Sequence, residues 1–197
     1  MAKLTRTEQL ALLRAALRAL DPQSAPDFAA FAALFRERSV RRGEVVVHAG
    51  EPCDSVALVA SGVARMYYTR DDGKEFIKAF VAASDFLAVL EALITREPSR
   101  LTIEALTPMQ LLVAPYATLA AFCERDVYWQ RIARRIVERV YVKKARREAA
   151  LLMDSAAVRY RAFATEHALL NRTVPDYHIA AYLGITPEAL SRLKRTQ

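Results

Sequence analysis

The spacing of hydrophobic and polar positions divides the chain into three parts. Leucines and phenylalanines recur every three or four positions over residues 5–20 and again over about 27–36, which predicts two helices. Residues 39–114 carry short β-branched or alternating runs separated by glycine-containing turns, which predicts strands. After Tyr116 the helical spacing returns. The pattern therefore predicts an α+β chain with a set of strands between two groups of helices.

The strand-rich part contains six runs of suitable length. The Asp72-Gly73 pair between two of them is typical of a hairpin turn. Residues 85–96 interrupt the strands and are expected to be helical. Short strands at regular spacing predict an antiparallel sandwich or barrel. The predicted strands are 45–47, 55–60, 63–69, 76–81, 101–106 and 110–113.

The helical part that follows is predicted to consist of residues 116–124, a long helix over about 126–152 and a further helix over 154–167, with a loop at 171–174. Trp129, Ile132, Ile136 and Val140 lie on one apolar stripe of the long helix. Such a stripe predicts pairing of two copies as a coiled coil, or alternatively packing against the chain's own strands. We expect domains at 1–124 and 154–197, with the long helix at 125–153 between them.

Residues 174–195 carry the pattern of a helix-turn-helix. Ile179, Ala180 and Leu183 share one helical face, and Gly184 can adopt the positive φ that ends the helix. Thr186 can cap a second helix, and Pro187 suits its first position because no N–H is needed there. Buried leucines at 190 and 193 would hold the two helices together. The second helix is then free to enter a DNA major groove, although an ordinary helical hairpin has the same pattern.

Charge is distributed unevenly along the chain, whose net charge is +7. Residues 129–197 contain 14 Lys or Arg and 6 Asp or Glu, whereas residues 1–128 contain 15 and 16. The basic excess therefore coincides with the helix-turn-helix pattern. This asymmetry favours a polyanionic partner such as nucleic acid over a merely solvated helix face.

Composition excludes several classes of protein. Hydrophobic residues make up 53% and charged residues 26% of the 197 positions, as in globular proteins, and no apolar run is long enough to span a membrane. The N-terminus lacks a signal-peptide pattern, so we expect a cytoplasmic protein.

Cys53 and Cys123 cannot by themselves form a structural metal site and are interpreted as reduced thiols. Whether either cysteine senses redox state stays open. No metal or other cofactor is predicted.

Several segments, taken in their order and spacing, resemble the Crp/Fnr family of bacterial transcription regulators from about Pro26 to the end of the chain. They are Arg42-Gly43-Glu44, Gly50-Glu51-Pro52-Cys53-Asp54-Ser55, Ser61-Gly62-Val63-Ala64-Arg65, residues 67–75, Arg96-Glu97-Pro98-Ser99-Arg100 and residues 182–192. The resemblance implies an N-terminal antiparallel β-roll of the cyclic-nucleotide-binding type (a double-stranded β-helix), a long dimerisation helix and a DNA-binding helix-turn-helix. The implied partners are double-stranded DNA, a second copy, RNA polymerase and a small-molecule effector.

The resemblance also assigns roles in the second helix of the motif. Family members read bases with residues that align with Pro187, Glu188 and Arg192. Glu188 can accept a hydrogen bond from cytosine and Arg192 can donate two to guanine, but Pro187 offers no side-chain donor. Phosphate contacts are expected from Thr186, Ser191, Lys194 and Arg195. His178 is expected at the surface, touching phosphate or without a role.

The family's cyclic-nucleotide pocket is altered in this sequence. The corresponding candidate pocket consists of Ala88, Val89, Leu90, Ser99 and Arg100. Ala88 stands at the family's glycine position, and Val89 stands at the position of the glutamate that accepts the ribose hydroxyl. Valine accepts no hydrogen bond, and an unpaired buried hydroxyl costs about 1–3 kcal/mol. The effector is therefore expected to be something other than cyclic AMP. Arg100 is interpreted either as an anion anchor or as a surface arginine paired with Glu97 or Glu104.

The sequence leaves two other classes of function as alternatives to DNA binding. Pro187 has no side-chain donor at a position that contacts bases in the family. This loss is compatible with an effector-binding or protein-interaction module whose helix-turn-helix no longer binds DNA. An enzyme on a cupin-like roll would need clustered metal ligands, yet of His48, His167 and His178 just one falls among the strands. We therefore expect no enzymatic activity. The effector, the operator sequence and the choice between activation and repression are not predicted.

Overall fold

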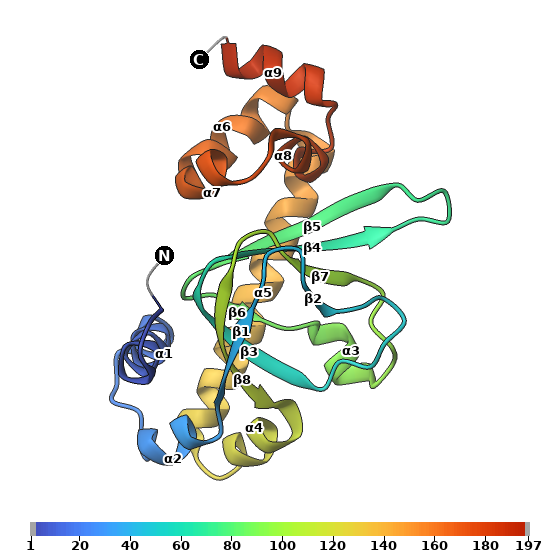
Figure 1. Ribbon diagram of the computed structural model, residues 1–197. Coiled ribbons are helices and arrows are strands. Elements are labelled where there is room, and N and C mark those ends of the chain that lie inside the picture. Colours follow the sequence, from blue (N-terminus) through green and yellow to red (C-terminus); the bar gives the residue numbers. More distant parts are fainter. Residues whose placement is uncertain (1–2, 196–197) are drawn as a thin grey trace. The chain divides into compact units, whose positions relative to one another are not determined.

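The computed structural model describes residues 3–195, which form two compact units (Figure 1). One unit contains residues 1–66 and 80–138, and the other contains residues 67–79 and 139–197. The second unit thus joins the outer part of a β-hairpin to the C-terminal helices. This division differs from simple blocks along the sequence, because residues 67–79 group with a distant part of the chain.

The strands form two four-stranded sheets, with orders β1-β8-β3-β6 and β2-β7-β4-β5. Pairs β1/β8, β3/β8, β3/β6 and β2/β7 are antiparallel. The predicted α+β roll is confirmed. The strands are β1 Arg36–Val40, β2 Val45–Val47, β3 Ser55–Ser61, β4 Val63–Thr69, β5 Glu75–Ala82, β6 Phe86–Leu87, β7 Thr102–Ala105 and β8 Met109–Pro115.

The turn between β3 and β4 requires glycine. Gly62 has φ +91°, and a Cβ atom built there would lie 2.5 Å from the Pro108 carbonyl oxygen. A side chain at this position would therefore meet backbone as well as adopt a disfavoured conformation. The β3–β4 turn can lie close to Pro108 and the start of β8 because residue 62 has no side chain.

Nine helices are found within residues 3–195. They are α1 Arg6–Leu20, α2 Phe28–Ala33, α3 Leu90–Thr95, α4 Tyr116–Cys123, α5 Val127–Met153, α6 Ala156–Glu166, α7 Ala168–Thr173, α8 Asp176–Leu183 and α9 Pro187–Arg195. Thr5 caps α1 in a reciprocal arrangement with Glu8, which explains where that helix begins.

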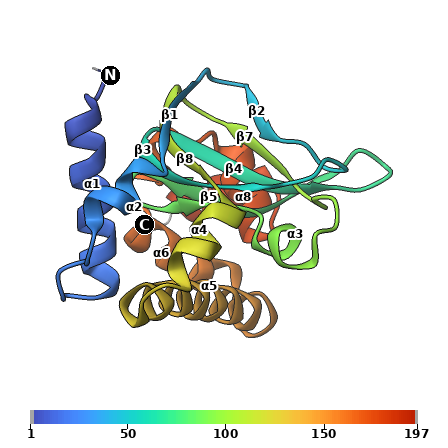
Figure 2. The same cartoon turned by 90° about the horizontal axis from the view of Figure 1, so that it is seen from below.

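The core of the first unit joins α1, α2, α4 and the start of α5 to strands β3 and β8 (Figure 2). Phe31 and Trp129 stack with ring centroids 4.1 Å apart, and Phe122 meets Trp129 edge-to-face at 5.3 Å. Asp21, just after α1, pairs with Arg131 and Arg135 of α5. An aromatic cluster and a charged cluster thus hold α1 and α5 together.

Three local predictions were wrong. Strand β1, residues 36–40, was not among the predicted strands, and the helix predicted over about 27–36 ends at Ala33. Four of the five residues of β1 are exposed and carry no apolar alternation, so the strand depends on pairing with β8. Residues 85–96 are helical only over α3, because Phe86 and Leu87 pair with β3. Residues 171–173 continue helix α7 where a loop was predicted.

Candidate nucleic-acid interface

The turn between α8 and α9 has the geometry predicted for a helix-turn-helix. Gly184 is left-handed, with φ 68° and ψ 35°, and the Ile185 N–H donates to the Ala180 carbonyl at 3.0 Å. These contacts satisfy carbonyl groups that the end of α8 would leave unpaired. The chain therefore reverses sharply after Leu183, and α9 begins only four residues later.

The first turn of α9 is capped by Thr186. Its hydroxyl oxygen accepts from the Ala189 N–H at 3.2 Å, and its carbonyl accepts from the Leu190 N–H at 3.0 Å. The Glu188 carboxylate accepts hydrogen bonds from its own backbone N–H and from the Thr186 hydroxyl, which lower its pKa. Glu188 is therefore ionised and held close to the helix N-terminus, where a negative charge is favourable.

Apolar residues lock the motif together. Ile179, Ala180 and Leu183 of α8 and Leu190 of α9 are buried, as are Tyr160 and Phe163 of α6. The predicted apolar face of α8 and the burial of Leu190 are confirmed, whereas Leu193 is only partly buried. Because these contacts occupy one side of α9, its other side faces outward.

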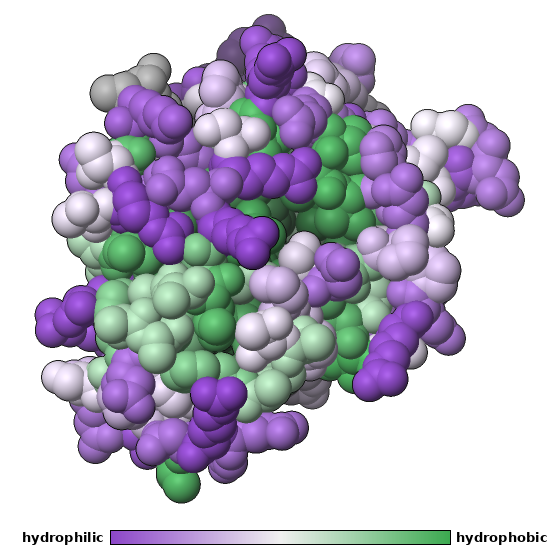
Figure 3. Space-filling view, turned by 60° about the horizontal axis from the view of Figure 1, so that its bottom comes forward, coloured by the Kyte–Doolittle hydropathy of each residue, from purple (hydrophilic) through white to green (hydrophobic). Residues whose placement is uncertain are grey.

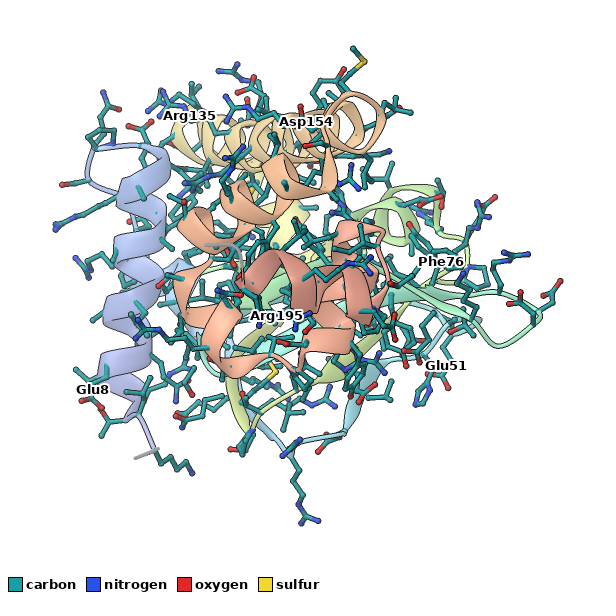
Figure 4. The ribbon with its side chains drawn as sticks, turned by 90° about the horizontal axis from the view of Figure 1, so that it is seen from above. Glu8, Glu51, Phe76, Arg135, Asp154 and Arg195 are labelled. Carbon is teal, nitrogen blue, oxygen red and sulfur yellow. The ribbon has the colours of Figure 1, made fainter. Side chains whose placement is uncertain are left out.

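The outward side of α9 carries most of the predicted DNA-binding residues. Thr186, Pro187, Glu188, Ser191, Arg192 and Arg195 are exposed. Figure 4 labels Arg195 at the end of this helix. Lys194 is half-buried and forms an ion pair with Asp176 at the start of α8. The motif thus presents a mixed polar surface on which Arg192 and Arg195 supply positive charge.

The expectation that His178 lies at the surface was wrong. Only 5% of the residue is exposed, and its ring lies 4.0 Å from that of Tyr177, which is itself exposed. Residue 178 precedes Ile179 and Ala180 on α8, so the same helix turn buries all three. His178 belongs to the interior of the motif and is not available for a phosphate.

Two arginines that the sequence did not single out bind the end of α8. Arg147 of α5 donates to the Tyr182 carbonyl and Arg159 of α6 donates to the Leu183 carbonyl. Burial lowers the pKa of Arg147 below its ordinary value. In the sequence Arg147 is one of several basic residues near it, and nothing in the local pattern distinguishes it.

The predicted dimer stripe on α5 divides into two parts. Trp129 and Ile132 are 1% and 2% exposed and belong to the core of their own unit, so assigning them to a dimer face was wrong. Their large side chains instead fill the space between α1, α2 and β8. Ile136 is partly buried against the same core.

The later part of α5 exposes apolar side chains. Val137, Val140 and Tyr141 are 44%, 47% and 69% exposed. One face of the molecule shows apolar patches bordered by hydrophilic residues (Figure 3). Of the four predicted dimer residues, Val140 is therefore the one that remains accessible.

The five candidate effector residues are not brought to one cavity. Val89 and Arg100 border a cavity of about 10 Å³, together with Glu91 and Glu97. Ala88 borders another cavity of about 20 Å³. Each has room for about one water molecule. Two carboxylates beside Arg100 also make the first cavity unfavourable for an anion.

Ser99 and Arg100 have different environments despite being neighbours. The buried Ser99 hydroxyl donates to the Leu101 carbonyl at 2.7 Å, and its oxygen accepts from the Leu101 N–H at 3.2 Å. Arg100 is exposed. Ser99 thus stabilises a local turn, and Leu90, in the first turn of α3, borders neither cavity.

The remaining chemistry of the described chain is sparse. No group of three His, Cys, Asp or Glu residues within 3–195 is arranged to hold a metal ion. Burial raises the pKa of the Cys123 thiol, which favours its protonated form.

Among the helices of residues 3–195, none combines the length and apolar character needed to cross a lipid bilayer.

Comparison with known proteins defines the class of fold. Residues 37–126 match the cyclic nucleotide-binding domain family, and a comparison with curated proteins found no match. The first of these results shows that the roll is similar to cyclic nucleotide-binding domains. With its long helix and helix-turn-helix, the chain has the fold of the Crp/Fnr transcription regulators, as its sequence predicted.

Solved structures carry the same arrangement at low identity. FixK2 from Bradyrhizobium japonicum is 23% identical, with a TM-score of 0.73 over 82% of this chain and 83% of that chain. CooA from Carboxydothermus hydrogenoformans, solved as a mutant, is 19% identical, with a TM-score of 0.68 over 91% and 82%. A protein from Eubacterium rectale described as a Crp/Fnr transcriptional regulator is 18% identical, with a TM-score of 0.69 over 89% and 84%.

Proposed function

We propose that this protein is a homodimeric transcription regulator that binds a specific DNA sequence through α9. The observation that carries this proposal is the anchored turn at Gly184, which buries one side of α9 and leaves Glu188, Ser191 and Arg192 exposed on the other. The motif also lies in the part of the chain that holds the basic excess. In this function residues 1–124 form the sensor, 125–153 the dimer helix and 154–197 the DNA-binding part.

In this proposal each exposed residue of α9 has a distinct task. Arg192 donates to a guanine, and Glu188 accepts from a cytosine amino group. Ser191, Arg195 and the N-terminus of α9 at Thr186 bind phosphates and fix the helix in the groove. Lys194 can contribute only if its pairing with Asp176 opens. Pro187 fixes the start of the helix without contacting a base.

Dimerisation would use the later part of α5. The exposed Val137, Val140 and Tyr141 supply the apolar surface for a second copy. Two recognition helices related by a twofold axis then read half-sites about 34 Å apart. Such a regulator works where bacterial DNA lies, in the cytoplasm, and RNA polymerase is its expected further partner.

The sensor domain would respond to something other than cyclic AMP. The predicted pocket has a valine at residue 89 and space for about one water molecule in each adjoining cavity. A small-molecule effector would therefore need to open the roll, or the signal would come from a protein.

Selection of duplexes from a random pool, followed by fluorescence anisotropy, tests this function. We expect a pseudo-palindromic sequence to be enriched and its affinity to fall by about 10³–10⁵-fold between about 50 and 200 mM salt. A shuffled duplex of equal length is the control. If no sequence is enriched, or if the affinity does not depend on salt, sequence-specific DNA binding is excluded and a protein-interaction module is favoured.

A further inference from the structure

One nitrogen atom of Arg147 connects the β-hairpin to the helix-turn-helix. Its Nη2 atom donates to the Ile77 carbonyl of β5 at 3.0 Å and to the Tyr182 carbonyl of α8 at 2.8 Å. Since Nη2 carries two hydrogens, each carbonyl can receive its own. The guanidinium carbon also lies 3.8 Å from the centre of the Tyr182 ring. Arg147 therefore contacts two segments that are about a hundred residues apart in sequence, and all of these residues belong to one compact unit.

The Tyr182 carbonyl, which receives one of these bonds, lies at the end of α8. The last carbonyls of a helix lack partners within the helix and carry its partial negative charge, so cations are favourable there. Arg147 binds the Tyr182 carbonyl, and Arg159 binds the next one, at Leu183, with a distance of 3.1 Å. The two arginines thus hold α8 from α5 and α6 immediately before the chain turns.

The position of α9 depends directly on this end of α8. Only Gly184, Ile185 and Thr186 separate the two helices, and a Cβ atom at residue 184 would lie 3.6 Å from Leu151 of α5. With so short a connection, a shift at Leu183 moves the start of α9. Base reading requires side chains to be held within about 0.5 Å of the productive geometry.

Resting on the DNA-binding function proposed above, we propose that Arg147 is a positioning residue that couples the recognition helix α9 to the hairpin of residues 67–79. When β5 keeps its place, Arg147 fixes the end of α8 and α9 is set for specific binding. A displacement of β5 moves the Ile77 carbonyl away from Arg147 and loosens the end of α8. The hairpin thereby becomes a control point for DNA affinity.

The neighbouring Arg146 provides a matched control, because it is exposed on the same helix. Arg147→Met and Arg146→Met each remove one cation, so both should weaken binding to a shuffled duplex to the same small extent. Only Arg147→Met should lower the ratio of specific to non-specific affinity, by about tenfold, as expected for a lost charge-assisted hydrogen bond. Arg147→Lys keeps the charge and replaces the guanidinium donors with those of an ammonium group, so it should retain a ratio closer to that of the unmodified protein.

These affinities are measured by anisotropy, with the duplex that the unmodified protein enriches and at a temperature where thermal unfolding shows every variant to be folded. An unmodified protein that prefers neither duplex would refute the proposed function. An unmodified protein with a clear preference that Arg147→Met leaves intact would refute the coupling alone. A role confined to stability would lower the unfolding temperature without changing the ratio, which also refutes the coupling.

A double-mutant cycle tests the link to the hairpin. Ile77 is buried and carries the carbonyl that Arg147 binds. If Arg147 transmits the position of β5, Ile77→Ala should lower specific affinity in the unmodified protein and have no further effect in the Arg147→Met background. Equal losses in both backgrounds would show that the hairpin acts independently of Arg147.

Discussion

Trp129 of α5 stacks on Phe31 of α2, with ring centroids 4.1 Å apart and ring planes inclined by 21°. The contact fixes the start of α5 to the N-terminal helices. A helix anchored in this way begins as part of the protein core and exposes an apolar surface only further along. The two ends of α5 should therefore respond differently to substitution.

Replacing Trp129 tests its core role. Trp129→Ala should lower the free energy of unfolding by about 3–5 kcal/mol, since it removes a buried indole and leaves a cavity. Urea denaturation at several protein concentrations measures this loss. A core role predicts the same loss at every concentration, whereas a role in a subunit interface would make the loss depend on concentration.

Val140→Glu tests the dimer surface. A carboxylate on this exposed apolar position should shift the protein from dimer to monomer while changing monomer stability little. Light scattering during size-exclusion chromatography measures the mass. Val127→Glu is the control, because Val127 is also exposed on α5 but lies at its first residue. Equal effects of the two substitutions would contradict an interface centred on Val140.

Arg192→Ala tests base reading. It should reduce affinity for the enriched duplex by about 1–3 kcal/mol and relax selection at one base pair per half-site. Arg161→Ala removes an exposed cation from α6 and should weaken all duplexes alike. Anisotropy with duplexes altered at single positions measures both effects. An unchanged base preference in Arg192→Ala would assign this residue to phosphate.

Gly184→Ala tests the turn. A methyl group there would make ordinary contact with Leu151, so the main cost is the positive φ, about 1–2 kcal/mol of unfolding free energy. Gly184→Asn should cost less, because asparagine tolerates this conformation better. Chemical denaturation compares the two, and equal stability of Gly184→Ala and the unmodified protein would refute the strain.

Asp21→Asn tests the dependence of stability on pH. A hydrogen bond from the Gln23 backbone N–H, followed by the contacts with Arg131, lowers the pKa of Asp21 below its ordinary value of 3.8. A lowered pKa in the folded state gives stability that is present above pH 3.8 and disappears as the pH falls through the folded value. Stability should therefore fall less steeply below pH 3.8 in Asp21→Asn than in the unmodified protein, as measured by thermal unfolding.

Sequence spacing predicted most elements of this fold because their cause is local. Gly184, Thr186 and Pro187 fix the turn and the start of α9 through their own conformational preferences. Strand β1 was missed because its exposed residues depend on β8 for pairing. Trp129 and Val140 share one stripe in the sequence, and only the packing of α1 and α2 separates their environments. Arg147 was missed for the same reason: its partners, Ile77 and Tyr182, become its neighbours only through folding.

The ion pair between Asp176 and Lys194 bears on how many counterions DNA binding would release. A lysine already neutralised by a carboxylate of its own motif displaces no cation from the duplex while that pairing lasts. The slope of log affinity against log salt concentration would then correspond to fewer positive charges than the last turn of α9 carries. The carboxylate at the start of α8 would thus act as an internal competitor of the phosphate backbone, tempering indiscriminate attraction to DNA.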